Sequence, residues 1–237
     1  MSQPLYVTKL DEHLAMLGRL ASTLSHAIRN PLGALFVLMD VLEEELPQPA
    51  SDRCAQVAQI LADMRTMLSR MDDLVQDYLS LARLAELHRE PVELGAIVEA
   101  YAQEMHKPCA DGGITLRLDG LTRLGQVYLH QNAFRRVLIN LMQNAIDAMP
   151  QGGELTLCGR QADSWACLAV QDTGEGIPAD QLSQLFVPFH TTKSDGTGLG
   201  LYVVREILAA HGGVITVTST PSTGTTCLVM LPLVAAE

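Results

Sequence analysis

The chain has 237 residues, of which 48% are hydrophobic, and its formal net charge is −11. The hydrophobic content allows a substantial core and excludes a chain that is disordered throughout. The negative charge argues against a nucleic-acid-binding surface, because phosphate contacts need clustered lysine and arginine. ATP is not excluded, since backbone amides and a metal ion can hold its phosphates.

The cysteines and the apolar runs indicate in which part of the cell the protein is expected. The five cysteines are odd in number and form no CxxC pair, so we expect them to be reduced core residues: Cys54, Cys109, Cys158, Cys167 and Cys227. The longest apolar run, around residues 33–41, is shorter than the roughly 20 residues that a bilayer crossing needs. Asp11 and Glu12 make the N-terminus unlike a signal peptide. We expect a cytoplasmic protein without a membrane segment.

Two segments in the first 90 residues repeat apolar side chains at alternating spacings of four and three. The first holds Leu10, Leu14, Leu17, Ala21, Leu24, Ile28, Pro31, Leu35, Leu38 and Leu42, and the second holds Val57, Leu61, Met64, Leu68, Met71, Val75, Tyr78 and Ala82. This pattern predicts two long packed helices. Pro47 and Pro49 interrupt it, which predicts a helical hairpin. Because two helices bury one stripe poorly, we expect a homodimer with a four-helix bundle.

Beyond about residue 88 the pattern changes. Short runs typical of strands lie at residues 114–118, 154–159, 165–171, 214–219 and 225–231, and helical patterns lie at residues 132–149 and 199–211. Helices and strands mixed in this way predict a two-layer α/β domain. With Pro91 marking the boundary, we expect a helical hairpin over residues 1–87 and an α/β domain over residues 88–237.

His26 lies at the f position of the first heptad pattern, which faces away from the partner helices. A lone surface histidine is usually only a solvated residue, but the neighbours of His26 are unusual. Pro31 lies inside the predicted helix, where it removes a backbone donor and kinks the helix. Imidazole suits a phosphoryl carrier because it is nucleophilic near neutral pH and is also a good leaving group. Asn30 lies on the same face and could position a water molecule or a phosphoryl oxygen.

Two further clusters suit a nucleotide. Asn140 and Asn144 lie at positions i and i+4 of an amphipathic helix, and neutral amide oxygens suit Mg²⁺ that already carries phosphate oxygens. Asp172 directly follows an apolar strand and precedes Gly174 and Gly176. Its carboxylate could accept from the exocyclic amine of adenine, and the glycines let the backbone approach the base. Each pattern on its own is also common on surface helices and loops.

A glycine-rich segment follows these clusters. Residues 186–193 lead into Gly196, Gly198 and Gly200, which open a predicted helix. Such backbone presents N–H groups and a positive dipole end to phosphates. Lys193 and the threonines before it would supplement this from a mobile lid, with His190 as a lid residue and not a catalyst. A dinucleotide-binding fingerprint is excluded, because no strand directly precedes the glycines and no acidic residue follows on a next strand.

In their order and spacing, these clusters resemble the N, G1, F and G2 boxes of two-component sensor histidine kinases, and residues 25–32 resemble the H box. The resemblance covers nearly the whole chain. The runs NLMQNAIDAMPQGG and PFHTTKSDGTGLGL are most similar to nitrogen-regulation and flagellar-regulation kinases. The resemblance to sensor histidine kinases implies a dimerisation and histidine-phosphotransfer hairpin of the HisKA type, followed by a Bergerat-type, GHKL-class ATP-binding domain.

The resemblance also implies a function. The kinase would phosphorylate His26 from Mg-ATP and pass the phosphoryl group to an aspartate of a response regulator, and Asn30 would help to dephosphorylate that regulator. Asn144 would hold Mg²⁺ with the assistance of Asn140, and Asp172 would bind adenine. The implied ATP-binding residues are Asn140, Asn144, Asp147, Asp172, Gly174, Gly176, Ile177, Thr191, Thr192, Lys193, Gly196, Thr197, Gly198, Leu199, Gly200, Leu201 and Thr225. Sensing would fall to a partner protein or to a region upstream.

One position departs from the family. The residue after the phosphorylated histidine is usually acidic, but here it is Ala27. Loss of a general base lowers a rate by ~10²–10⁴, so the alternative is a phosphatase-biased or vestigial kinase that acts as a dimeric phosphotransfer scaffold. Chaperone-like or topoisomerase-like ATPases and serine kinases share the ATP fold, but they lack a histidine-bearing hairpin directly upstream.

Overall fold

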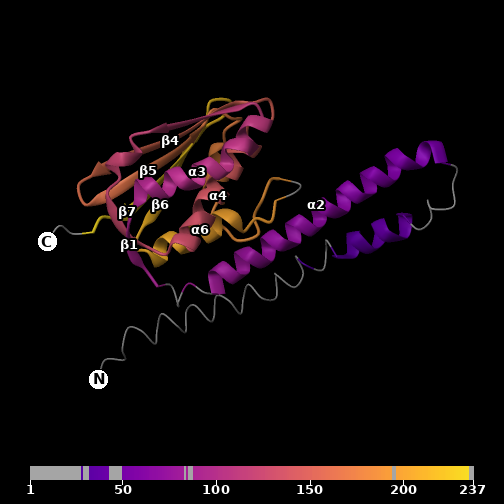
Figure 1. Ribbon diagram of the computed structural model, residues 1–237, viewed down its shortest axis with the longest axis horizontal. Helices are drawn as coiled ribbons and strands as arrows, with labels where there is room; N and C mark the ends of the chain where they lie inside the picture. Colours follow the sequence, from indigo (N-terminus) through magenta and orange to yellow (C-terminus); the bar gives the residue numbers. More distant parts are fainter. Residues whose placement is uncertain are drawn as a thin grey trace, which may run out of the picture. The chain divides into compact units, whose positions relative to one another are not determined.

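The computed structural model describes residues 28, 32–42, 50–82, 84, 88–193 and 196–234. These residues form two compact units. One unit is helical and comprises the described residues up to 84 together with residues 191–197, and the other comprises residues 88–190 and 198–234 (Figure 1).

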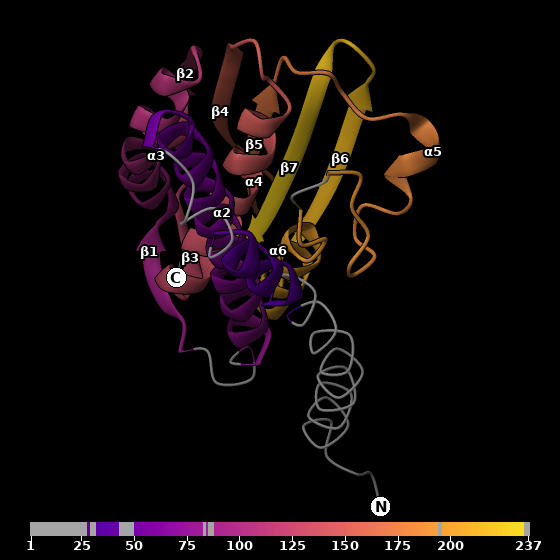
Figure 2. The same cartoon turned by 90° about the vertical axis from the view of Figure 1, so that its right-hand side faces the viewer.

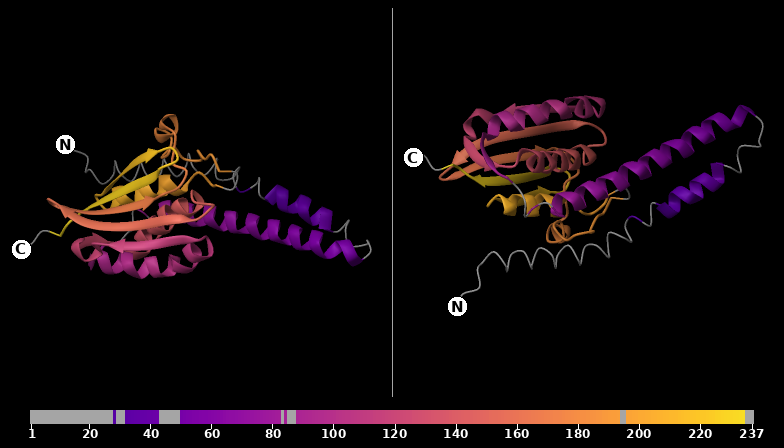
Figure 3. Two further views of the ribbon diagram at one scale, coloured as in Figure 1. Left: turned by 90° about the horizontal axis from the view of Figure 1, so that it is seen from above. Right: turned by 60° about the horizontal axis from the view of Figure 1, so that its bottom comes forward.

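The helical unit is built around the long helix α2 (Ala50–Ala82). Its sequence contains no glycine or proline and is rich in alanine, leucine and methionine, which favours an uninterrupted helix. Residues 32–42 are also helical and run alongside α2 (Figures 1 and 3). The second predicted helix is therefore confirmed. Of the first predicted helix only residues 28 and 32–42 are described, and the predicted break at residues 47–49 lies outside the described residues.

The second unit contains a five-stranded sheet with the order β2-β4-β5-β7-β6. Strands β2 and β4 pair in parallel, whereas the other neighbours pair antiparallel. The strands are β2 (Ile114–Asp119), β4 (Gly153–Ala162), β5 (Trp165–Asp172), β6 (Val214–Thr220) and β7 (Gly224–Pro232). All five strands predicted from the sequence are thus present.

Helices α3 (Leu94–Asp111), α4 (Gln131–Asp147) and α6 (Gly200–Ala210) form the second layer (Figure 2). Helix α4 packs between α3 and α6 and also contacts β4 and β5. Its buried residues recur every three or four positions and form the centre of the core: Phe134, Val137, Leu138, Leu141, Met142 and Ala145. The predicted helices at residues 132–149 and 199–211 correspond to α4 and α6. The predicted fold class, a helical region followed by a two-layer α/β domain, is confirmed.

Several elements were not predicted. Strands β1 (Glu90–Glu93) and β3 (Gln126–Leu129) form a small antiparallel sheet. Helix α3, the short helix α5 (Ala179–Leu182) and a 3₁₀ turn at Leu121–Arg123 were also missed. None of the described helices has the length and apolar character that a bilayer crossing requires.

Candidate nucleotide-binding site

Asp172 lies at the end of β5 and is held by two backbone amides. Its Oδ1 accepts from the N–H of Gly174 at 2.9 Å and from the N–H of Thr225 at 3.1 Å. Burial raises the pKa of the Asp172 carboxyl, and the two backbone hydrogen bonds act in the opposite direction. Both of these hydrogen bonds end on Oδ1, and neither ends on Oδ2. The carboxylate is therefore oriented before any ligand binds.

The turn after Asp172 is wedged between α4 and the β6–β7 hairpin. The N–H of Glu175 donates to the carbonyl of Ala148, and a Cβ on Gly174 would lie 2.5 Å from that same oxygen. On the other side, the N–H of Ile177 donates to Ser219 Oγ at 2.8 Å. Gly176 has a φ of +68°, which favours glycine. The backbone of the predicted base-binding turn thus requires its glycines.

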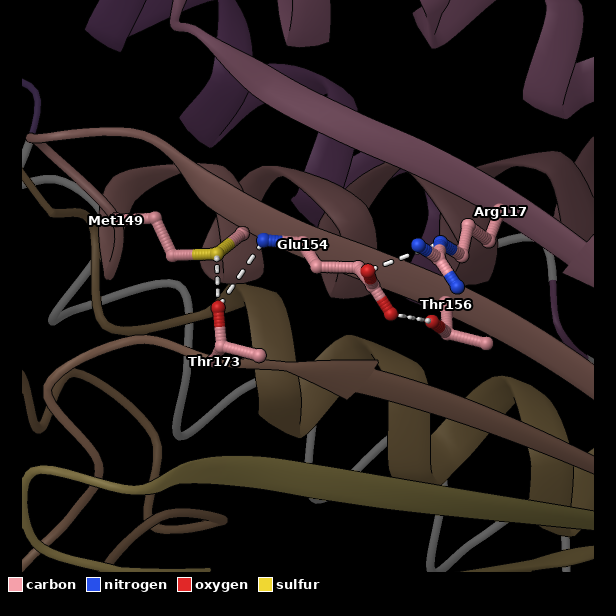
Figure 4. Close-up of polar contacts among 5 residues, drawn as sticks. All are labelled: Arg117, Met149, Glu154, Thr156 and Thr173. Carbon is pink, nitrogen blue, oxygen red and sulfur yellow. Dashed lines mark hydrogen bonds and ion pairs between the residues drawn. The ribbon is translucent and has the colours of Figure 1, made fainter.

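Thr173 forms a second set of contacts that fixes the same turn (Figure 4). Its hydroxyl donates to Met149 Sδ at 3.7 Å and accepts from the N–H of Glu154 at 3.0 Å. The carboxylate of Glu154 pairs with Arg117 Nε at 2.9 Å and accepts from the hydroxyl of Thr156. The exposed ion pair adds little stability. Thr173, which directly follows Asp172, is thus linked to Met149 just beyond the end of α4.

Asn140 connects α4 to α6. Its Nδ2 donates to the carbonyl of Gly200 at 3.2 Å, and a Cβ on Gly200 would lie 3.4 Å from Asn140 Oδ1. Asn144 follows one turn later on α4, while the exposed Asp147 accepts from Gln143 Nε2 at 2.7 Å. The amide oxygens of both asparagines are hard, neutral donors that fit Mg²⁺ carrying phosphate oxygens. Among the described residues no group of three or more His, Cys, Asp or Glu could hold a metal ion.

Within the α/β unit, a backbone hydrogen bond joins the two residues that flank the glycine-rich segment, Phe189 and Gly198. The N–H of Phe189 donates to the carbonyl of Gly198 at 2.8 Å. Both residues have positive φ, +63° for Phe189 and +68° for Gly198. A Cβ on Gly198 would lie 2.5 Å from the carbonyl carbon of Phe189, so only glycine fits there. Leu199 is buried directly before α6 begins at Gly200, and Leu201 follows in its first turn.

The remaining predicted residues divide into two groups. Thr191, Thr192, Lys193, Gly196 and Thr197 belong to the segment that clusters with the helical unit. Within that segment the N–H of Lys193 donates to Thr191 Oγ1 at 3.1 Å. His26 and Asn30 lie outside the described residues.

Sequence reasoning missed Ser219. Its hydroxyl lies 2.9 Å from Thr225 Oγ1 and 3.0 Å from the carbonyl oxygen of Gly224. The signal that could have identified it is the alternation along β6, which places Ser219 on the same face as Val217 and opposite Thr225 on β7.

Two family models match the chain. The model of the His Kinase A phospho-acceptor domain matches residues 16–87, and that of the histidine kinase-, DNA gyrase B- and HSP90-like ATPases matches residues 129–235. The fold and the site therefore define an ATP-binding domain of the class that these three protein groups share.

Individual relatives agree with both matches. Sensor histidine kinase ZraS of Escherichia coli K12 is 34% identical over 225 residues, covering 95% of this chain and 47% of ZraS. Sporulation kinase A of Bacillus subtilis is 31% identical over 230 residues, covering 94% of this chain and 36% of the relative. The chain thus spans half or less of the length of these relatives. It belongs to the two-component sensor histidine kinase family.

A solved structure extends the agreement to the fold. Histidine kinase ThkA, in complex with response regulator protein TrrA, matches with a TM-score of 0.79 and 22% identity. The match covers 98% of this chain and 68% of ThkA.

Proposed function

We propose that this chain is the kinase core of a sensor histidine kinase, which transfers the γ-phosphoryl group of ATP to His26 and then to an aspartate of a response regulator. The observation that carries the proposal is the presence, in one chain, of a phosphoacceptor-domain match and an ATP-binding domain in which backbone amides orient Asp172. The proposed domains are the hairpin at residues 1–87 and the catalytic domain at residues 88–237.

In the proposed ATP complex, the second carboxylate oxygen of Asp172 accepts from the amine of adenine. Mg²⁺ would be held by Asn144 with the help of Asn140, and it would neutralise phosphate charge when bound. The residues proposed to line the nucleotide further are Asp147, Gly174, Gly176, Ile177, Thr191, Thr192, Lys193, Gly196, Thr197, Gly198, Leu199, Gly200, Leu201 and Thr225. Phosphoryl transfer needs little beyond positioning and charge neutralisation, which these groups can supply.

His26 is the proposed nucleophile, and Asn30 is proposed to orient the water that hydrolyses the phosphoaspartate of the regulator. Ala27 cannot accept the proton of His26, so autophosphorylation would proceed without an adjacent side-chain base. The alternative of a vestigial scaffold is not favoured, because ZraS and sporulation kinase A, which match nearly the whole chain, are both named as kinases.

The proposed homodimer is supported by an apolar stripe on α2. Leu61, Leu68 and Val75 recur every seven residues and are 44%, 56% and 38% exposed. Heptad-spaced apolar side chains on a helix are typical of a surface that another helix covers. A second copy of the hairpin would bury this stripe in a four-helix bundle.

The proposed partners are a receiver domain of a response regulator and an upstream sensor protein. The first is supported by ThkA, which matches this fold and was solved with response regulator protein TrrA. We propose a cytoplasmic location for the kinase core, because its phosphoryl donor would be cellular ATP.

The proposal is tested with γ-³²P-labelled ATP and Mg²⁺. We expect an acid-labile, alkali-stable label on the protein, as a phosphohistidine requires. The label should be absent in His26→Gln and strongly reduced in Asn144→Ala. Label that persists in His26→Gln, or no label in the native chain under any condition, would refute the proposed reaction.

A further inference from the structure

Four side chains form a row across the sheet at the proposed base-binding site. Ser219 on β6 is in register with Thr225 on β7, and Asp172 on β5 is in register with Leu155 on β4. The N–H of Thr225 donates to Asp172 and joins the two halves of the row. Thr225 and Leu155 are both buried. The row therefore places one hydroxyl, that of Thr225, beside the carboxylate proposed to bind adenine.

The hydroxyl of Ser219 has three partners. It accepts from the N–H of Ile177 at 2.8 Å and donates to the carbonyl of Gly224 at 3.0 Å. It also lies 2.9 Å from Thr225 Oγ1. A serine hydroxyl has one proton and two lone pairs. Because the Gly224 carbonyl can only accept, the single proton of Ser219 goes to it, and the proton in the third contact must come from Thr225.

This count determines what Thr225 can offer a ligand. Its proton is directed at Ser219, so Thr225 Oγ1 can only accept a hydrogen bond from any other direction. Asp172, when ionised, is likewise an acceptor only. Side by side, the two groups present hydrogen-bond acceptors and no side-chain donor.

We propose that Ser219 is a positioning residue that directs the Thr225 proton away from the base and thereby makes the site selective for a purine with an amine at position 6. The inference rests on the proposed function, since it requires ATP to bind beside Asp172.

The chemistry of the two common purines explains the selectivity. Adenine carries an amine at position 6, which donates to Asp172. A water molecule can donate to N1 of adenine and to Thr225 Oγ1 at the same time. Guanine carries an oxygen at position 6, which finds only acceptors. Without Ser219 the Thr225 hydroxyl can rotate and donate to that oxygen, so the penalty against guanine falls.

The test compares the dissociation constants of Mg-ATP and Mg-GTP for the full chain. Ser219→Ala is expected to lower the preference for ATP over GTP by about three- to tenfold, the size of one neutral hydrogen bond. Ser219→Thr keeps the hydroxyl and should retain the native preference. Thr218→Ala is the matched control, because Thr218 lies on the same strand and is exposed. Should Ser219→Ala fail to fold, Ser219→Cys preserves the volume and is expected to shift the preference in the same direction.

A double-mutant cycle separates this role from general support of the fold. In a Thr225→Val background there is no hydroxyl to orient, so Ser219→Ala should leave the preference unchanged. Equal weakening of both nucleotides by Ser219→Ala in the native background would overturn the inference and leave the proposed function intact. Failure of the native chain to bind Mg-ATP would instead refute the proposed function.

Discussion

Asp172 combines a proposed role in adenine binding with a cost to the stability of the folded protein. Burial raises the pKa of its carboxyl, so the ionised form is disfavoured in the folded protein. Asp172→Asn removes this penalty, and the Asn Oδ1 can still accept from Gly174 and Thr225. It also places an amide donor where the adenine amine would donate. We expect the melting temperature without ligand to be unchanged or higher, and the affinity for Mg-ATP to fall by about ten- to a hundredfold, as for loss of a hydrogen bond to a charged group.

Calorimetric titration and thermal melting measure these two effects separately. Asp180→Asn is a suitable control, because Asp180 is an exposed aspartate on α5. It should alter neither quantity. A variant of Asp172 that binds Mg-ATP normally would contradict the proposed contact with adenine.

His211 is a buried histidine whose tautomer follows from its partners. It is 3% exposed, and its Nε2 accepts from the backbone N–H of His130 at 3.0 Å. Because that N–H can only donate, Nδ1 carries the ring proton and donates to the Ile207 carbonyl at 2.7 Å. Burial lowers the pKa of His211, and the charges of Arg89 and His130 lower it further. The neutral ring thus connects the end of α6 to the start of α4.

Stability should therefore fall in mildly acidic solution. As the pH drops below about 6.5, histidine in the unfolded chain gains a proton while His211 in the folded chain does not. The contribution of His211 to the free energy of unfolding is complete above that pH and is lost as the pH falls through its lowered pKa. His211→Gln should destabilise the protein by about 1–3 kcal/mol at neutral pH and flatten this pH dependence. Urea denaturation at a series of pH values measures both the loss of stability and its pH dependence. His106→Gln is the control, because His106 is exposed.

At the scale of elements, the helices and strands with a clear repeat of apolar residues are those that the sequence predicts. The five sheet strands and helices α4 and α6 have clear periods and were predicted. Strands β1 and β3 have four residues each, too few for a period to emerge. Helix α3 was missed although Leu94, Val98, Ala102, Met105 and Cys109 are buried at helical spacing. Pro108 inside α3 and Pro91 just before it argue against a helix in the sequence, because proline is disfavoured in a helix interior.

Within the site, residue types were predictable and their partners were not. The order of the motifs predicts Asp172 and Asn140 as candidate nucleotide-binding residues, and this stays a prediction. However, Asp172 bonds to Thr225 across 53 residues, and Asn140 bonds to Gly200 across 60 residues. Such pairs depend on strand register and helix packing, which no local pattern contains. For the same reason the contacts of Ser219 with Ile177, Gly224 and Thr225 are visible only in the structure.

The exposed stripe on α2 yields a prediction about assembly. Leu68→Glu places a charge in the middle of this stripe. If each copy buries Leu68 in the dimer, about 1.5–3 kcal/mol of burial is lost twice, so dissociation should increase at least about a hundredfold. Analytical ultracentrifugation over a concentration series measures this. Thr66→Glu introduces the same charge at an exposed position on another side of α2. Equal dissociation of both variants would rule out the stripe as the interface.

At the scale of the whole molecule, the proposed reaction joins two units with different roles. The ATP-binding domain would supply the activated phosphoryl group, and the helical hairpin would supply the nucleophile. Relatives such as ZraS are about twice as long as this chain, of which 95% aligns with ZraS.

The least typical feature of the whole reaction is Ala27 beside His26. An acidic side chain there would orient the imidazole and take its proton, and such a general base accelerates a reaction by ~10²–10⁴. We therefore expect Ala27→Glu to increase the initial rate of His26 labelling from Mg-ATP, with the affinity for Mg-ATP unchanged because residue 27 lies outside the ATP-binding domain. The double variant Ala27→Glu with His26→Gln should show no label, which excludes phosphorylation of the new carboxylate. An unchanged labelling rate in Ala27→Glu would mean that removal of the His26 proton does not limit the reaction.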